Sequence, residues 1–249
     1  MINYLRADLG RIYKRIPRAI VLGFFYALAL GIEIYVVRSQ NTIDSVSFTE
    51  SVVSSLNMLM IGFGLVETNA LFSDDFKAHS ISYAIGSGIS RRRIVAEKLI
   101  ASFILVLTDM AFGALLFMIM GTFTGVKLQG YQLWTLTVVV VMGAVQISLI
   151  LSLVMFFIIY VHGSGAGLVV FLIMCFDPLD KVLIFLSDNK IVQSLHLKEL
   201  TYSSVSDKLM TQLNLGIGIP AAQLLGVIIY FAIGFGLAML VFKKQEPEF

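Results

Sequence analysis

Residues 128–176 read LQGYQLWTLTVVVVMGAVQISLILSLVMFFIIYVHGSGAGLVVFLIMCF, a run of 49 residues that contains no Lys, Arg, Asp or Glu. A helix needs roughly 20 consecutive apolar residues to cross the ~30 Å hydrocarbon core of a bilayer. The run is long enough for two helices, and the turn at residues 162–165 is so short that they must be antiparallel neighbours. The chain is therefore predicted to be an integral membrane protein.

The composition of the whole chain supports the same class. Of its 249 residues, 58% are apolar and 14% are charged, whereas soluble domains average about 45–50% and about 25%. The net charge of +2 gives no indication of nucleic-acid binding. The single cysteine, Cys175, cannot form a disulfide framework or a multi-thiolate metal site within one chain.

The apolar segments predict an all-α, polytopic membrane protein with six transmembrane helices in one permease domain, residues 1–249. The predicted spans are 18–37, 51–72, 94–121, 133–161, a fifth that begins at 166, and 221–242. The fifth span is irregular, because its apolar character stops at Asp177-Pro178 and resumes at Val182. The first span resembles a secretory signal, but its apolar run continues to Val37, so we interpret it as a membrane helix.

Before the first span, apolar residues recur at helical spacing with basic residues between them. The apolar set is Ile2, Leu5, Leu9, Ile12 and Ile16, and the basic set is Arg6, Arg11, Lys14 and Arg15. This pattern predicts a basic amphipathic helix over residues 2–16. Such a helix can lie in the headgroup layer with its cations towards anionic lipid, or it can pack on a soluble partner.

The distribution of Lys and Arg predicts the orientation, because cytoplasmic flanks of membrane helices collect these residues. With the N-terminus inside, 12 of the 18 Lys and Arg residues fall on the cytoplasmic side. An even number of spans then makes both termini cytoplasmic. The polar segment 187–220 is expected to be extracellular, and the 73–93 loop between the second and third spans is expected to be cytoplasmic.

The 73–93 loop has its own helical signals. Ser73 is expected to cap a short helix whose first turn contains Asp74 and Asp75, since acidic residues stabilise a helix N-terminus. Gly86 and Gly88 are expected to end that helix. Ser90 would then cap the third span. A short helix held between two membrane helices can transmit a push from a soluble protein, although a solvated loop with basic residues would look similar.

Motifs for chemistry are absent from the sequence. No G-x-x-x-x-G-K-[ST] phosphate-binding loop occurs, so the chain is not expected to hydrolyse ATP. The three histidines lie in different loops, and no metal site is predicted. His162 and Ser164 suggest a membrane protease, but two residues in one tight turn cannot readily form the hydrogen bond that activates a serine. No catalytic residue is predicted, and the chain is not expected to be an enzyme.

Several polar residues lie within the predicted spans. Asp109 lies deep in the third span, where a charge is costly enough to suggest a functional site. It can line a translocation path, or it can be a protonated structural acid. Glu67 and Gln146 are further candidates for the path. Polar residues in spans also join helices within one subunit. The polar set is completed by Asn69, Ser148 and Ser152.

The layout and one motif resemble a known family. The 73–93 loop ends in Gly-Ser-Gly-Ile-Ser-Arg, residues 86–91, and is followed by Ile94, Val95, Glu97, Lys98 and Leu99. Together with the basic N-terminal helix and six spans, this resembles the permease subunits of ABC type-2 (ABC-2) exporters. The layout covers nearly the whole chain, whereas the motif covers about 25 residues.

The resemblance implies an N-terminal elbow helix at residues 2–16 and a coupling helix in the 73–93 loop that contacts a separate ATPase subunit. The contacts would fall on Asp75, Phe76, His79, Ser80 and Tyr83. ATP and Mg²⁺ would be used by that partner, and this chain would hold no cofactor. The resemblance also implies a second permease, identical or related, and short re-entrant helices between the fifth and sixth spans.

These expectations give a function that can be tested. The chain is expected to be the permease subunit of an exporter in a bacterial cytoplasmic membrane. Its compact size and short loops resemble small exporters of antimicrobial or other amphipathic peptides. An ion-coupled secondary transporter that uses Asp109 or Glu67 as a proton site is the main alternative, although no internal repeat is evident in the sequence.

Overall fold

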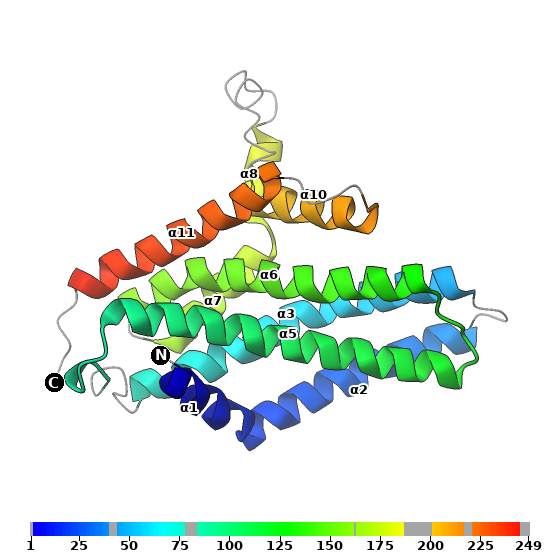
Figure 1. Cartoon of the computed structure of the whole chain (residues 1–249), viewed down its shortest axis with the longest axis horizontal. Coiled ribbons are helices and arrows are strands. Elements are labelled where there is room, and N and C mark those ends of the chain that lie inside the picture. Colours follow the sequence, from blue (N-terminus) through cyan, green and yellow to red (C-terminus); the bar gives the residue numbers. More distant parts are fainter. Residues whose placement is uncertain are drawn as a thin grey trace.

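The computed structural model describes residues 2–39, 44–77, 84–161, 163–186, 201–216 and 221–244. Within these ranges the regular structure is helical, which confirms the all-α prediction (Figure 1). The helices are α1 (Ile2–Tyr13), α2 (Ile16–Ser39), α3 (Ser45–Lys77), α5 (Arg91–Phe123), α6 (Gly130–Val161), α7 (Ser164–Cys175), α8 (Pro178–Phe185), α10 (Tyr202–Asn214) and α11 (Ala221–Lys244).

Five helices are long and apolar enough to cross a membrane, and they coincide with the predicted first, second, third, fourth and sixth spans. Their candidate membrane segments are Ile16–Ser39, Ser45–Phe72, Arg91–Phe123, Gly130–Val161 and Ala221–Lys243. At the place of the predicted fifth span lies α7, whose 12 residues extend about 18 Å. Because the hydrocarbon core is ~30 Å thick, α7 alone is too short to cross it. Five of the six predicted spans thus correspond to helices long and apolar enough to cross a membrane, and the six-span prediction is not confirmed.

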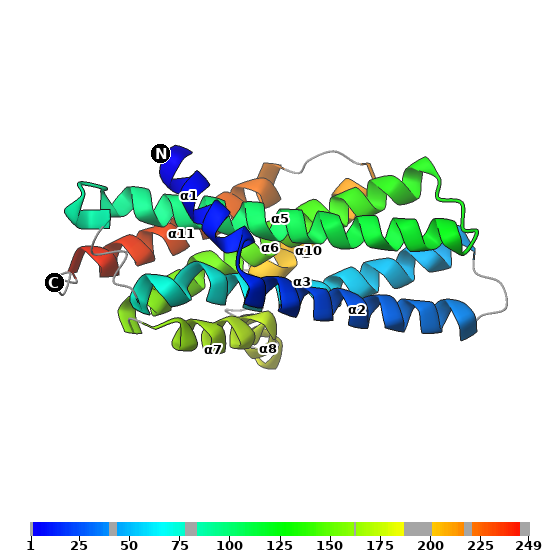
Figure 2. The same ribbon diagram turned by 90° about the horizontal axis from the view of Figure 1, so that it is seen from below.

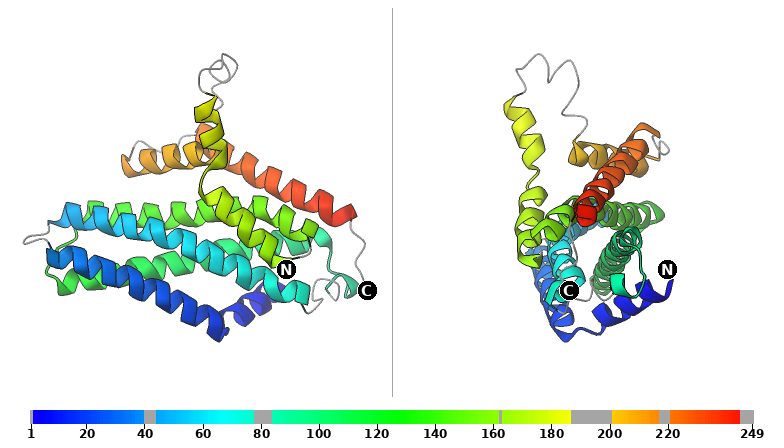
Figure 3. Two further views of the ribbon diagram at one scale, coloured as in Figure 1. Left: turned by 180° about the vertical axis from the view of Figure 1, so that it is seen from behind. Right: turned by 90° about the vertical axis from the view of Figure 1, so that its left-hand side faces the viewer.

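The break at Asp177-Pro178 was predicted correctly. Asp177 has a left-handed backbone conformation, with φ of 49° and ψ of 57°, and Pro178 begins α8. A proline disfavours helical backbone in the residue before it, so α7 cannot continue. Figure 3 shows that α8 turns away from the bundle after this break.

Helix α6 is the centre of the bundle. It packs against α3, α5, α7, α10 and α11, and most of its surface is buried, whereas α2 and α11 are largely exposed. The exposed faces of α2 and α11 are apolar, which is the pattern expected of helices that face lipid. Their large exposed side chains include Ile20, Phe24, Ile32, Leu225, Ile228 and Leu240.

Two glycines allow close helix packing. A Cβ atom added to Gly234 of α11 would lie 2.3 Å from Ser152 Oγ and 2.8 Å from the Ser152 carbonyl carbon of α6. A Cβ atom on Gly64 of α3 would lie 2.1 Å from the ring of Phe171 of α7. Small residues at such crossings are typical of membrane helices, because they let backbones approach closely.

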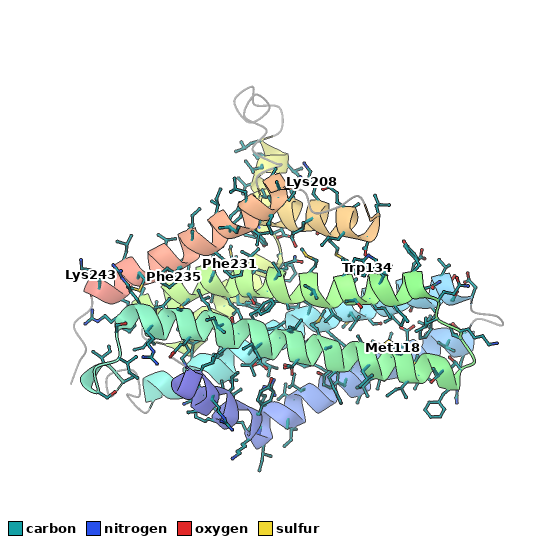
Figure 4. All side chains as sticks on the ribbon, in the orientation of Figure 1. Met118, Trp134, Lys208, Phe231, Phe235 and Lys243 are labelled. Atoms are coloured by element: carbon teal, nitrogen blue, oxygen red, sulfur yellow. The ribbon has the colours of Figure 1, made fainter. Side chains whose placement is uncertain are left out.

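Helix α10 lies within the polar segment 187–220, which was predicted to be extracellular. It packs on α6 and α11. It begins at Thr201, whose side-chain oxygen accepts a hydrogen bond from the Ser204 backbone N–H. The Tyr202 hydroxyl donates to the carbonyl of Met174 at the end of α7. The single tryptophan, Trp134 of α6, donates its Nε1–H to the carbonyl of Leu213 at 3.1 Å (Figure 4). These contacts hold α10 against α6 and the end of α7.

One end of the bundle contains the N-terminus, the end of α3, the start of α5 and the C-terminal end of α11 (Figures 1 and 2). We call it the α3–α5 end. The Arg91 guanidinium donates to the Phe242 carbonyl and lies 5.5 Å above the Phe242 ring. This pair joins the start of α5 to the end of α11.

The capping prediction at Ser73 was wrong. Helix α3 continues without interruption to Lys77, so Asp74 and Asp75 lie in its last turns and not in the first turn of a new helix. No Gly or Pro lies between Ala70 and Lys77, and extending an existing helix is easier than nucleating another. Ser90 does precede α5 as its N-cap residue, but its side chain makes no capping hydrogen bond. Gly88 has a φ of 89°, which fits the predicted helix end there.

Candidate functional site

Helix α2 packs on the bundle through a single stripe of side chains. The stripe consists of Arg18, Leu22, Tyr26, Ala29 and Glu33. Their spacings of four, four, three and four residues place them on one face of a helix. Two of the five are charged, and they lie near opposite ends of α2. Each end of this mostly exposed helix therefore has one buried charged residue.

At one end of the stripe, Arg18 forms a buried ionic cluster with Glu67 of α3 and Asp109 of α5. Its Nε donates to Glu67 Oε1 at 2.8 Å. Its Nη2 lies 2.9 Å from both Asp109 Oδ1 and Oδ2. The exposed fractions are 9% for Arg18, 0% for Glu67 and 6% for Asp109. Three helices are thus joined by one guanidinium in water-poor surroundings, where charge-assisted hydrogen bonds are strong.

Two tyrosines complete the cluster. The Tyr26 hydroxyl donates to the Asp109 backbone carbonyl at 2.9 Å. The Arg18 guanidinium lies 5.1 Å above the Tyr13 ring of α1, a cation–π geometry. The Tyr13 hydroxyl also lies 2.7 Å from Thr108 Oγ1. The fixed position of Arg18 therefore depends on α1 as well as on α3 and α5.

The cluster has an excess of acid. If Glu67 and Asp109 are both ionised, their two negative charges face the one positive charge of Arg18. The second Glu67 oxygen, Oε2, is buried and has no hydrogen-bond partner among the described residues. A buried charge without a partner is strongly unfavourable. The arrangement can therefore accept one further proton or another positive charge.

A second buried ion pair connects α1 to the bundle. Lys98 Nζ of α5 donates to Asp8 Oδ2 at 2.7 Å and to the Leu71 carbonyl of α3 at 3.0 Å. The apolar stripe of α1 also faces the protein: Ile12 is fully buried, and Leu5 and Leu9 pack on the core. Figure 2 shows α1 crossing α5 at a steep angle. The apolar side of α1 therefore contacts α5. The two predicted environments were the lipid headgroup layer and a soluble partner, and neither included this contact.

The structure brings together two of the three residues predicted to line a translocation path. Glu67 and Asp109 share Arg18, whereas Gln146 is half-buried on α6 and is not a member of the cluster. Of the other polar span residues, Ser148 and Ser152 are buried and Asn69 is exposed.

Part of the predicted ATPase contact lies outside the described residues. Asp75 and Phe76 belong to the last turn of α3, but their side chains are not described, and His79, Ser80 and Tyr83 lie outside the described ranges altogether. The coupling contact stays a prediction.

The residue that sequence reasoning missed is Arg18. It is the first residue of the predicted span 18–37, and no role was predicted for it. Its signal was its place in the stripe, four residues before Leu22 and eight before Tyr26.

Comparisons of the sequence with protein-family models and with curated proteins found no match. The candidate site is therefore identified from its geometry alone.

Proposed function

We propose that the chain is the permease subunit of an ABC exporter in a bacterial cytoplasmic membrane, powered by ATP hydrolysis in a separate ATPase subunit. The observation that carries the proposal is the hairpin of α3 and α5. Each helix has 33 residues, or about 50 Å at 1.5 Å per residue. The hydrocarbon core needs only ~30 Å, so the hairpin is long enough to project from the bilayer.

The projecting side would be the α3–α5 end, where Arg91, Arg92 and Arg93 begin α5. The last two residues of α11, Lys243 and Lys244, lie at the same end (Figure 4 labels Lys243). A concentration of basic residues is typical of a cytoplasmic face. A cytosolic ATPase would then contact the loop between α3 and α5, through Asp75, Phe76, His79, Ser80 and Tyr83.

The ionic cluster connects the α3–α5 hairpin to α2. A force that the ATPase applies to the hairpin would therefore reach α2 within the membrane. Glu67 lies ten residues before the end of α3, and Asp109 lies 18 residues after the start of α5. Both are bound to Arg18 at the start of α2. Movement of the hairpin would therefore displace α2 as well. Because α2 faces lipid with few buried apolar contacts, it is the helix best suited to open a path beside α3.

The test is co-expression with the ABC ATPase encoded nearest to this chain, followed by purification and an ATPase assay. We expect a stable complex that hydrolyses ATP. Phe76→Ala and Tyr83→Ala should each weaken it without loss of membrane insertion. Tyr131→Ala is the matched control, because this exposed tyrosine lies at the start of α6, at the opposite end of the bundle. Failure of the wild-type chain to associate would contradict the proposal.

The geometry of Glu67 and Asp109 also supports an ion-coupled secondary transporter as a second candidate. Two carboxyl groups that share one guanidinium can gain and lose a proton during transport. The discriminating assay is proton flux into proteoliposomes that contain this chain alone, without ATPase. Flux that is abolished by Glu67→Gln and Asp109→Asn would favour this candidate over the permease.

A further inference from the structure

A small cavity lies between the starts of α3 and α6, at the end of the bundle opposite the α3–α5 end (Figure 1). Its volume is about 280 Å³, slightly below the roughly 300–1,000 Å³ of pockets that hold drug-sized ligands. Four residues of α3 and three of α6 line it. The cavity is therefore large enough for a small ligand. Neither the ionic cluster nor the proposed ATPase contact includes its residues.

Two polar residues of the lining, Thr49 and Gln132, bind other parts of the protein. Thr49 Oγ1 donates to the Ser45 carbonyl at 2.7 Å. Gln132 Oε1 accepts a hydrogen bond from the Gln129 backbone N–H at 2.9 Å, and Gln132 Nε2 donates to Ser45 Oγ at 3.2 Å. Because Gln132 is buried, its amide joins the start of α6 to the start of α3. These two side chains shape the cavity.

Glu50 and Thr135, which also line the cavity, do not have such partners. The Glu50 side chain is exposed, and no salt bridge within the described ranges includes it. Thr135 Oγ1 is buried and has no hydrogen-bond partner among the described residues, which is unfavourable for a hydroxyl group. The cavity thus combines a negative charge without a cation and a hydroxyl oxygen that can still accept a hydrogen bond.

The other acid at this end of α2 and α3 belongs to a different contact. Glu33 of α2 is fully buried and accepts hydrogen bonds from Ser51 Oγ and Ser55 Oγ of α3, at 2.9 Å and 3.1 Å. None of these three residues lines the cavity. Glu50 is therefore the acid that a ligand in the cavity would meet.

Two valines give the cavity an apolar wall next to Glu50. Val46 lies four residues before Glu50 and Val53 lies three residues after it, so the three side chains share one face of α3. A ligand with a charged end and an apolar stem can therefore place the charge at Glu50 and pack the stem on the valines.

We propose that this cavity binds a primary ammonium group carried on a short alkyl stem. An ammonium group has three N–H donors. One can form a charge-assisted hydrogen bond with the Glu50 carboxylate, and a second can satisfy Thr135 Oγ1. A divalent metal ion does not fit, because such ions take about six or more oxygen ligands and the described lining contains one carboxylate. Binding here would not require the ATPase subunit, so the site stands apart from the proposed function.

Isothermal titration calorimetry with n-butylammonium chloride, on the full chain in phosphatidylcholine nanodiscs, tests the proposal. We expect saturable binding that empty nanodiscs do not show. Glu50→Gln should weaken it at least about tenfold, because a hydrogen bond to a charged group is lost. Asp44→Asn is the matched control, since Asp44 is an exposed acid that does not line the cavity. In about 0.15 M salt it should change the affinity less than about twofold. Equal losses for both variants would overturn the proposal.

A second ligand tests the hydrogen bonds separately from the charge. Butyltrimethylammonium has the same charge and stem but no N–H donor, so it should bind at least about tenfold more weakly than n-butylammonium. Thr135→Val should weaken n-butylammonium binding about two- to tenfold. The control Thr137→Val, an exposed position of α6 outside the cavity, should leave it unchanged. Equal affinity for the two ligands would contradict the assignment of a primary ammonium site.

The source of the ammonium group can be a soluble amine or the headgroup of phosphatidylethanolamine. Nanodiscs that contain phosphatidylethanolamine distinguish the two. Weaker binding of n-butylammonium in them would show that the lipid amine occupies the cavity, and unchanged binding would assign the cavity to a soluble amine. Either result supports the site, whereas the absence of saturable binding in both kinds of nanodisc would overturn it.

Discussion

Arg18→Met would show how strongly the ionic cluster holds the bundle. The change removes the guanidinium and leaves Glu67 and Asp109 buried without their cation, at 0% and 6% exposure. Removing one partner of a buried ion pair costs about 3–5 kcal/mol. Since two carboxylates lose their partner here, we expect the free energy of unfolding to fall by at least about 3 kcal/mol.

The assay is unfolding in mixed detergent micelles, followed by the fluorescence of Trp134, the single tryptophan. Arg6→Met, at an exposed position of α1, should have little effect. The triple variant Arg18→Met, Glu67→Gln, Asp109→Asn removes all three charges and should recover most of the lost stability. The reasoning is refuted if Arg18→Met is as stable as the wild type, or if the triple variant is no more stable than the single one.

Two packing predictions use the same unfolding assay. Gly234→Val places a side chain within 2.3 Å of Ser152 Oγ and should lower the free energy of unfolding by about 1–3 kcal/mol. Gly236→Val, with nothing within 4 Å of its Cβ position, should be nearly neutral, and equal losses at both positions would count against the proposed crossing. Phe171→Ala should cost about 3–5 kcal/mol, because the fully buried ring fills the space above Gly64. The exposed Phe176→Ala should cost less than about 1 kcal/mol, and a similar cost for both variants would contradict this packing.

Much of the fold could be predicted because the membrane imposes a minimum length on apolar helices. The uncharged run 128–176 predicted α6 and the return of α7 beside it, and both are confirmed by their packing. The break at Asp177-Pro178 could also be predicted, since proline disfavours helical backbone in the residue before it. The full crossing of the fifth segment was not confirmed. An apolar run sets the possible length of a helix, whereas the described α7 ends at the break.

The candidate site was harder to predict because it depends on which faces of distant helices meet. Glu67 and Asp109 were evident as charges within spans, but nothing local in the sequence assigned Arg18 to both of them. They are separated from Arg18 by 49 and 91 positions in the chain. Glu33 was missed for a similar reason: its hydroxyl partners lie on α3, beyond the α2–α3 connection. Arg18 and Glu33 both lie on the buried stripe of α2, but the sequence alone does not show which face of α2 is buried.

The orientation of the α3–α5 end is the claim on which the proposed function depends. In a Cys175→Ala background, Ser90→Cys at the start of α5 and Thr124→Cys at the other end of the same helix provide single labelling sites. A membrane-impermeant maleimide applied to intact cells should label position 124, and should label position 90 only after the cells are permeabilised. Labelling of position 90 in intact cells would place the α3–α5 loop outside the cell and contradict the proposed coupling to a cytosolic ATPase.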